Sequence, residues 1–449
     1  MRNRNFTALA SLILSLVFFA TSMSLAFQGP AAINNPDTAA LNAADEILKT
    51  VSRLRQLEIK HAVKRDFKTK DQIEQSVIRD LDENTSPEEF EATRKTLIKL
   101  GLVKNDFRLR DYIVQLLREQ VAGYYEPKTK EFYLAAWLPL SDQKRVIAHE
   151  LMHALQDQHF DLRRFERWPK GDSDAELAAH ALVEGEATLV MIQYELEQSG
   201  FRLDLNISLT NLMLENDGAE DKQYPIMANA PKVLRENLQF PYIYGAGFAQ
   251  AVLRKGSWPL VNEAYARLPV STEQILHPEK FLDPDNPTEV KLADALAVLG
   301  KGWRQADSDI NGEFGYRVLL SEFISKSAAQ AAGAGWDGDR YALYENPRTG
   351  DVLLVQYTTW DTPGDAQEFL KAYAQRTERR YNIGTPKNTQ QQSLTYETGE
   401  GIVAVELRGS DVLIIEGAQS REHLAKLMER MWQSEKRERQ GAMSKPARN

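Results

Sequence analysis

Cysteine is absent from the 449 residues, which excludes disulfides, thiolate metal ligands and a cysteine nucleophile. Any bound metal must therefore be held by histidine, aspartate or glutamate. The chain also lacks an excess of positive charge, because its formal net charge is -9 and basic and acidic residues are intermixed along it. This balance argues against a nucleic-acid partner.

Long apolar runs are also scarce, and the longest stands at the start of the chain. It spans residues 6–20, follows Arg2 and Arg4, and precedes the small residues of Ser24-Leu25-Ala26. Such a pattern is typical of a cleavable secretory signal peptide, and the run is shorter than a usual membrane span. We expect a signal peptide at 1–26, a secreted or periplasmic protein, and no stable membrane span in the mature form. An uncleaved segment would instead act as an anchor.

The remaining chain has enough hydrophobic residues, 43% of the total, for a large core, and its length suggests two or three compact units. Helical and strand patterns predict an α+β fold. We expect a flexible linker at 27–40 and a mainly helical domain with a small β-hairpin or sheet at 41–330. A small α+β domain at 336–436 and a disordered tail at 437–449 complete the prediction.

The most specific motif is HELMH at 149–153, an HExxH sequence inside a predicted helix from Ser141 to about Gln158. His149 and His153 are four residues apart and so lie one turn apart on one helix face, where both imidazoles can bind one ion. Glu150 is beside them and can take a proton from a metal-bound water without being a ligand. A structural polar cluster is the alternative, but burying these groups without partners would be costly.

A catalytic zinc has three protein ligands and a water, so a third ligand is needed. A second helix, predicted from a capping box at Ser173 to about Glu197, carries Glu184 and Glu186 among apolar residues. The two carboxylates are two residues apart and point to nearly opposite sides, so only one can face the ion. We favour Glu184 as the ligand. Glu186 would instead orient an imidazole through its other ring nitrogen, or pair with a buried lysine or arginine. His180 is an alternative ligand, or a residue that contacts a ligand without binding the metal.

His159 offers a different ligand geometry. It follows His149 by ten residues, which is the spacing of the metzincin pattern HExxHxxGxxH. The glycine that turns the chain out of the helix in that pattern is replaced here by Gln156. If the helix continues past this point, His159 lies about 9 Å farther along the axis than His153 and cannot share its ion.

Four segments together carry a resemblance to a known family. They are HELMHALQDQHF at 149–160, ALVEGEAT at 181–188, GYYEPKTKEFYL at 123–134 and STEQILHP at 271–278. Over roughly residues 40–325 the chain resembles a bacterial family of proposed zinc metallopeptidases that is similar to the gluzincins, and GWDGDRY and TTWDTPGDAQEF continue the resemblance. It implies a zincin-like domain, Zn²⁺ bound by His149, His153 and Glu184, and Glu150 as base. The thermolysin-type NExxxD pattern is missing around the glutamate.

Aromatic residues near these motifs are candidates for substrate contacts. The hairpin before the HExxH helix would supply an edge strand on which an extended peptide can pair, with Tyr124 and Tyr125 as substrate-binding residues. The alternative is that both tyrosines are core aromatics. We name Tyr244 and His277 as catalytic groups that stabilise an oxyanion, although a buried tyrosine or a loop histidine also suits a structural role.

These patterns predict a secreted zinc metallopeptidase that hydrolyses a peptide or protein substrate with a water activated by Glu150. A different class is a non-catalytic, zinc-stabilised binding or folding factor outside the cytoplasm, in which the carboxy-terminal domain recognises the partner. Glu150 argues against this alternative, because a structural metal site needs no base. A metal-dependent hydrolase of non-peptide bonds is a third class.

Overall fold

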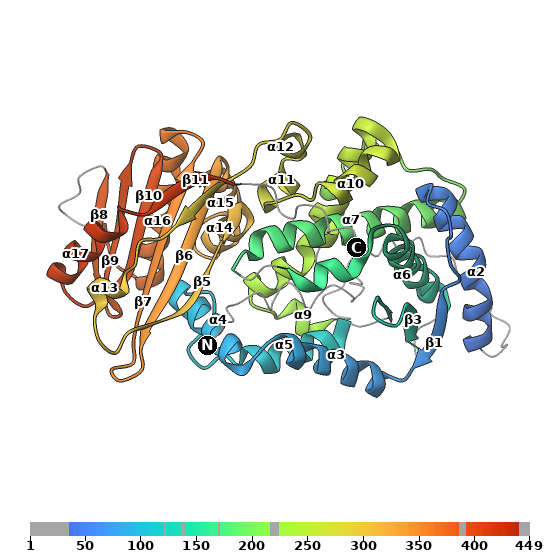
Figure 1. Cartoon of the computed structure of the whole chain (residues 1–449), viewed down its shortest axis with the longest axis horizontal. Helices are drawn as coiled ribbons and strands as arrows, with labels where there is room; N and C mark the ends of the chain where they lie inside the picture. Colours follow the sequence, from blue (N-terminus) through green and yellow to red (C-terminus); the bar gives the residue numbers. More distant parts are fainter. Residues whose placement is uncertain are drawn as a thin grey trace, which may run out of the picture.

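The computed structural model describes residues 36–120, 123–135, 140–168, 171–215, 224–385 and 392–439. A helical lobe and a lobe built on a six-stranded sheet lie side by side along the long axis of the molecule (Figure 1). This mixed architecture confirms the predicted α+β class. The predicted signal peptide and most of the predicted tail lie outside the described residues. Within the described residues, no helix combines the length and the apolar character that crossing a bilayer requires.

The helical lobe contains most of the first 282 residues of the chain. Its helices are α2 (Pro36–Arg55), α3 (Lys70–Asn84), α4 (Pro87–Leu100), α5 (Leu109–Gln120), α6 (Leu140–Phe160), α7 (Ser173–Gln198), α8 (Leu209–Glu215), α9 (Pro225–Ala228), α10 (Lys232–Ala266), α11 (Thr272–Leu276) and α12 (Pro278–Leu282), with a 3-10 helix at Leu162–Arg167. Helix α2 begins inside the stretch predicted as a linker at 27–40, so residues 36–40 are helical rather than flexible.

A small sheet borders this lobe, with the strand order β1-β3-β2. Its strands are β1 (Lys64–Lys68), β2 (Gly123–Glu126) and β3 (Glu131–Ala135). The predicted hairpin is β2–β3, in which Tyr124 pairs with Tyr133. Strand β1 pairs with β3 in parallel and adds a third strand to the predicted hairpin. Strand β2 therefore lies at an edge of this sheet.

Helices α6, α7 and α10 form the centre of the helical lobe. Helix α7 is buried almost throughout its first five turns, and α10 packs along it. The two helices come close where glycines face each other, because a Cβ atom on Gly185 would lie 2.0 Å from the carbonyl carbon of Gly245. Only residues without a side chain allow this approach. The glycine pair therefore fixes how α10 sits against the middle of α7.

The amino-terminal cap of α7 differs from the predicted capping box at Ser173. Asp172 is the cap residue, and its side chain accepts a hydrogen bond from the Ala175 amide at 3.3 Å. The Asp174 carboxylate turns inward instead and accepts from the Thr272 amide at 3.2 Å. The helix therefore begins where predicted, but a different carboxylate satisfies its first amides.

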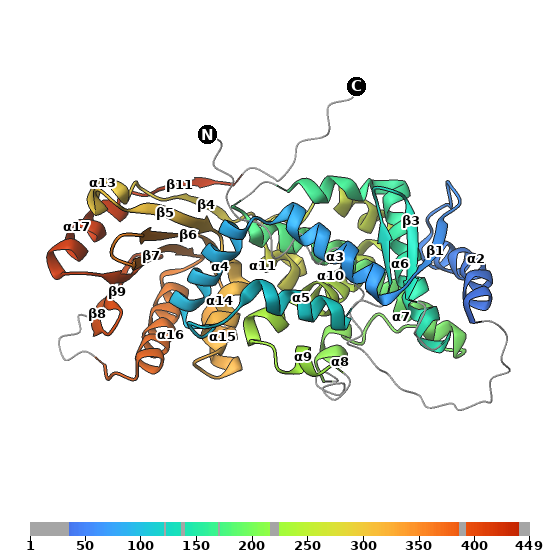
Figure 2. The ribbon, with the colours of Figure 1, turned by 90° about the horizontal axis from the view of Figure 1, so that it is seen from below.

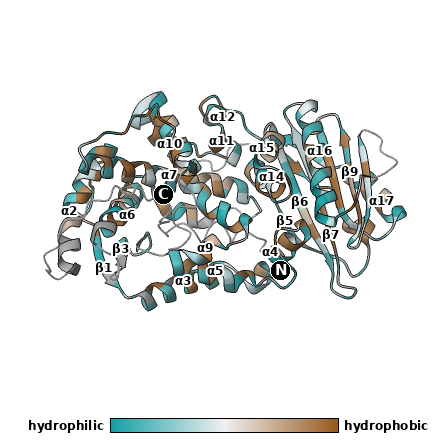
Figure 3. Ribbon diagram, turned by 180° about the vertical axis from the view of Figure 1, so that it is seen from behind, coloured by the Kyte–Doolittle hydropathy of each residue, from teal (hydrophilic) through white to brown (hydrophobic). Residues whose placement is uncertain are grey.

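The second lobe is built on an antiparallel sheet with the strand order β5-β6-β7-β10-β9-β8. Its strands and helices are β5 (Arg304–Asp309), β6 (Trp336–Asn346), β7 (Asp351–Trp360), β8 (Ser393–Thr398), β9 (Gly401–Arg408), β10 (Asp411–Ala418), α13 (Leu296–Leu299), α14 (Gly312–Ser321), α15 (Lys326–Gly333), α16 (Pro363–Tyr381) and α17 (Arg421–Met431). Hydrophobic residues on the two faces of the sheet form two separate cores, one with α14, α15 and α16 and one with α13 and α17 (Figure 3).

The boundary predicted at residues 330–336 falls inside this second lobe. Strand β5 is paired with β6, and strand β4 (Thr288–Lys291) is paired with β11 (Glu435–Glu438). The lobe therefore begins near Thr288, and β11 continues it into the stretch predicted as a tail at 437–449. The sequence analysis missed β4 and β5 because their partners lie far away along the chain.

Helix α4 joins the two lobes, although it comes from the amino-terminal part of the chain (Figure 2). Thr96 donates a hydrogen bond to the Asp307 carboxylate at 2.9 Å, and Leu100 belongs to a core of the sheet lobe. The fully buried Arg376 donates to the carbonyl of Leu100 and pairs with Glu416 at 2.8 Å. The sheet lobe is thus completed by a helix that lies about 190 residues before its first strand.

Candidate metal centre

The HExxH motif lies in the interior of α6, which presents both imidazoles to α7. His149 and His153 are buried, with exposures of 1% and 3%. Their ring centroids are 4.7 Å apart and the ring planes are nearly perpendicular, at 82°. The intervening residues Leu151 and Met152 are buried apolar side chains, so α6 has no solvent-facing side at this point. The imidazoles therefore meet their partners inside the protein.

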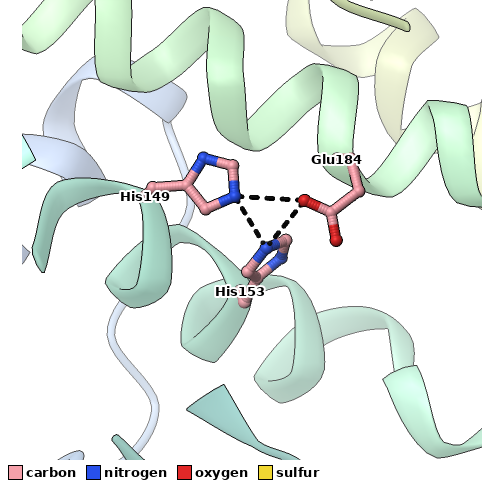
Figure 4. A group of neighbouring side chains, drawn as sticks. All are labelled: His149, His153 and Glu184. Atoms are coloured by element: carbon pink, nitrogen blue, oxygen red, sulfur yellow. Dashed lines mark hydrogen bonds and ion pairs between the residues drawn. The ribbon is translucent and has the colours of Figure 1, made fainter. Parts of the chain in front are cut away.

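Glu184, from the middle of α7, meets the two imidazoles (Figure 4). Its Oε2 atom is 3.1 Å from His149 Nε2 and 3.3 Å from His153 Nε2, and the two Nε2 atoms are 3.0 Å apart. Ligand atoms about 2.0–2.1 Å from a tetrahedral zinc are separated from one another by about 3.3 Å. The triangle of donor atoms therefore has nearly the size that such an ion requires.

The hydrogen bonding of the triad also fits a cation. Two imidazole Nε2 atoms that face each other at 3.0 Å need a proton or a cation between their lone pairs. Within the described residues, Glu184 Oε1 and His149 Nδ1 make no hydrogen bond, although both atoms are buried. This buried group can hold a metal ion.

Protons compete with a metal for these atoms. Burial would raise the pKa of Glu184, but the two imidazoles outweigh it and lower that pKa to about 2. Burial would lower the pKa of His153, but the Glu184 carboxylate raises it to about 9. Burial lowers the pKa of His149. The triad therefore favours one carboxylate and one imidazolium, and a metal that binds must displace a proton.

Glu150 is fully buried next to the triad and faces strand β2. Its Oε2 atom accepts a hydrogen bond from the Tyr125 amide at 2.6 Å, whereas Oε1 makes none within the described residues. Burial raises the pKa of Glu150 to about 8, and the His153 imidazole and the Tyr125 amide partly offset this rise. Oε1 is thus the oxygen of Glu150 that is placed to accept or return a proton.

Tyr242 is a residue of this site that the sequence analysis passed over in favour of Tyr244. Its hydroxyl donates a hydrogen bond to the Glu184 carboxylate, and its ring centroid is 6.1 Å from that of His149. Burial and the carboxylates of Glu184 and Glu150 raise its pKa well above the ordinary value, so it stays protonated. The glycines of α7 and α10 were the available signal, because their crossing brings Tyr242 to Glu184.

Tyr244 and His277 lie elsewhere. The ring of Tyr244 stacks on Phe240 at 5.2 Å and packs against Phe314. His277 lies between α11 and α12, where its Nε2 atom is 3.1 Å from a carboxylate oxygen of Glu313 and 3.2 Å from Arg317. His277 is not among the donors that converge with Glu184, and the catalytic roles of Tyr244 and His277 stay predictions.

Glu186 points away from the triad, toward Arg55 and Tyr265, from which it accepts hydrogen bonds. It reaches His153 only through Gln156. The Gln156 side chain lies 2.7 Å from His153 Nδ1 and donates to Glu186 at 2.6 Å. Glu186 thus acts on the imidazole through Gln156 rather than by direct contact. It also pairs with a buried arginine, as the alternative prediction stated.

The two other histidines considered as ligands do not join the triad. Helix α6 continues to Phe160, and His159 contacts the carbonyl of Glu58 at 2.7 Å. His180 is buried one turn before Glu184 on α7, but it is not part of the group of converging donors. The structure therefore gives no support to the metzincin geometry.

Tyr124 and Tyr125 are core residues, with exposures of 5% and 3%. The Tyr124 ring packs against Tyr133 at 5.1 Å, and the Tyr125 hydroxyl donates to Asp157 at 3.0 Å. Their side chains are thus occupied within the protein, as the alternative of core aromatics states. Near the triad, Tyr125 contributes its backbone rather than its side chain. Its amide lies on the outer edge of β2 and donates to Glu150.

Comparison with known proteins identifies one part of the chain. A family described as a domain of unknown function, DUF8575, matches residues 299–428. This match covers most of the sheet lobe and begins more than a hundred residues after Glu184, so it does not include the triad. No curated protein and no solved structure gave a significant match. The function of the candidate metal centre is therefore inferred from its own geometry.

Proposed function

We propose that this protein is a zinc-dependent peptidase that acts outside the cytoplasm. The observation that carries the proposal is the convergence of His149, His153 and Glu184 within 3.3 Å of one another, with the buried Glu150 beside them. Two imidazoles and one carboxylate are a ligand set used by catalytic zinc sites, and they leave one position of a tetrahedral ion open. The signal-like start of the sequence supports export.

Each residue has a distinct chemical task in this proposal. When bound, zinc supplies Lewis acidity, which makes water a nucleophile near neutral pH and polarises a carbonyl. Glu150 Oε1 makes no hydrogen bond within the described residues and is the atom that takes the proton from the attacking water. The same carboxyl then gives this proton to the leaving amine. The Tyr125 amide holds Oε2 and so leaves Oε1 to react.

A peptide substrate is favoured by the position of β2. Among the described strands β2 pairs with β3, and the Tyr125 amide on its outer edge donates to Glu150. An extended peptide that adds beside β2 would use the other main-chain groups of this edge, next to the base, whatever the side chains of the peptide. Tyr242 stays protonated beside Glu184, and its hydroxyl can turn from this carboxylate to donate to the developing oxyanion.

The proposal is tested by measuring zinc content and peptide-library cleavage for the wild type and three variants. Glu150→Gln keeps an oxygen that accepts from the Tyr125 amide, so it should bind zinc normally but lose at least about a hundredfold in turnover. Glu184→Gln should lose both zinc and cleavage. Gln158→Ala is the control, since Gln158 lies on the same helix but contacts residues 60–61. Undiminished cleavage by zinc-loaded Glu150→Gln would refute the proposed base and favour another class of function.

A further inference from the structure

We infer that Gln156 is a positioning residue that fixes the orientation of His153, and that the buried pair of Arg55 and Glu186 holds Gln156 in place. The inference rests on the proposed metal centre and adds residues that no simple ligand pattern contains. It links the end of helix α2 to a ligand on α6 through four side chains. Three of the four are fully buried, and His153 is 3% exposed.

The first link joins Gln156 to His153. The Gln156 Oε1 atom is 2.7 Å from His153 Nδ1. An amide oxygen only accepts hydrogen bonds, so Nδ1 of the imidazole must carry a hydrogen. In the neutral imidazole the lone pair is then on Nε2, which is the atom that faces His149 and Glu184. Gln156 therefore selects the form of His153 that can bind a metal through Nε2.

The second link fixes which end of the Gln156 amide faces His153. The Nε2 atom of Gln156 is 2.9 Å from the Val183 carbonyl and 2.6 Å from the Glu186 carboxylate, which both only accept. A flipped amide would place its oxygen against these two acceptors and would lose both hydrogen bonds. The donor end must therefore point toward α7, and the acceptor end toward the imidazole.

The third link keeps Glu186 an acceptor. Arg55 donates to one oxygen of Glu186, and Gln156 and Tyr265 donate to the other. Arg55 is itself held by Asn262 at 2.6 Å and lies over the ring of Trp258, 4.4 Å from its centroid. Each of these three groups donates, so both oxygens of Glu186 are engaged as acceptors. The last residue of α2 thus supports the orientation of a ligand on α6.

The two histidines differ in this support. His149 Nδ1 makes no hydrogen bond within the described residues, so the network acts on His153 alone. Gln156 also stands at the position where the metzincin pattern needs glycine. Helix α6 continues through this position to Phe160, which lets a side chain there reach back to the imidazole three residues before it.

The inference is tested with Gln156→Met, which keeps the length and shape of the side chain but removes its strong acceptor and both donors. In metal-free, histidine-¹⁵N-labelled protein, the His153 Nδ1–H proton should be protected from solvent exchange in the wild type and lose this protection in the variant. The affinity for zinc should fall about ten- to a hundredfold, as is typical when an outer partner of a ligand is lost.

Gln158→Met is the matched control, because it changes the same residue type two positions along the same helix. Gln158 binds the loop at residues 60–61 and does not contact His153. This variant should keep both the protected proton and the zinc affinity of the wild type. Equal zinc affinity and equal proton protection in wild type and Gln156→Met would overturn the inference.

A third variant tests the role of Glu186, which acts on His153 only through Gln156. Glu186→Gln offers Gln156 an amide that can donate as well as accept, so Gln156 can flip and the His153 proton should lose part of its protection. Full protection in Glu186→Gln would overturn the role assigned to Glu186. A wild type that binds zinc but cleaves no peptide would refute the proposed function, whereas the proton measurement would still decide the role of Gln156.

Discussion

Substitution of Gly245 by alanine should weaken metal binding, although Gly245 contacts no ligand atom. A Cβ atom on Gly245 would lie 2.1 Å from the carbonyl oxygen of Ala181, and real Cβ atoms do not approach other atoms within 3.0 Å. The neighbour is backbone of a buried helix and cannot rotate away. Helices α7 and α10 must therefore separate by about 1 Å at this point, because protein interiors leave no spare room.

The consequence for the metal follows from the tolerance of metal–ligand bonds. Glu184 lies one turn after Ala181 on α7, and bond lengths in metal sites hold within about 0.2 Å. A displacement of about 1 Å should cost about a hundredfold or more in zinc affinity, and the strained packing about 1–3 kcal/mol of stability. Tyr242, one turn before Gly245, should lose its hydrogen bond to Glu184.

The assay is a competition for zinc against a chromophoric chelator, with unfolding in urea measured on the same samples. Gly315→Ala is the control, since this helical glycine in α14 would place its Cβ 3.3 Å from the nearest side-chain atom. That variant should bind zinc normally, and its stability should change by less than about 1 kcal/mol, because the helix propensity of alanine opposes the tight contact at 3.3 Å. Gly245→Ala with the zinc affinity and stability of the wild type would refute the argument from the helix crossing.

Further outcomes follow from other parts of the structure. Tyr242→Phe should keep zinc but reduce kcat about ten- to a hundredfold, measured on a defined peptide; unchanged kcat would remove Tyr242 from the reaction. Burial raises the pKa of Asp174 to about 8, far above its unfolded value, so its contribution to stability is greatest below pH 4 and declines as the pH rises to 8. For Asp174→Asn, the free energy of unfolding measured in urea should depend less on pH across that range. The same pH dependence as in the wild type would contradict this. Arg376→Met should cost about 1–3 kcal/mol, because it removes one of the two guanidinium partners of the buried Glu416 while Arg380 remains, and calorimetry that shows no loss would contradict the pairing.

The parts of the site that the sequence predicts are those set by local geometry. The spacing of His149 and His153 fixes them to one face of α6, because four residues make about one helical turn. The two-residue spacing of Glu184 and Glu186 likewise turns them to opposite sides of α7, where one meets the imidazoles and the other meets Arg55. No knowledge of the tertiary fold is needed for either statement.

The rest depends on contacts between distant segments, which no local pattern encodes. Tyr242 was passed over for Tyr244 because the choice rests on how α10 crosses α7. Gln156 was treated as a missing glycine, since its partner Glu186 lies 30 residues away. The start of the sheet lobe was placed too late, because β4 pairs with β11 across some 144 residues. Long-range pairing of this kind cannot be predicted from short apolar stretches.

The placement of α4 has a consequence for anyone who wishes to dissect this protein. The segment matched by the family of unknown function is continuous in sequence, but the folded unit is assembled from two separate stretches of chain. Excising residues 288–439 would strip the Leu100 carbonyl from Arg376 and open an apolar face. A soluble fragment should therefore require a peptide of residues 87–100 supplied alongside it.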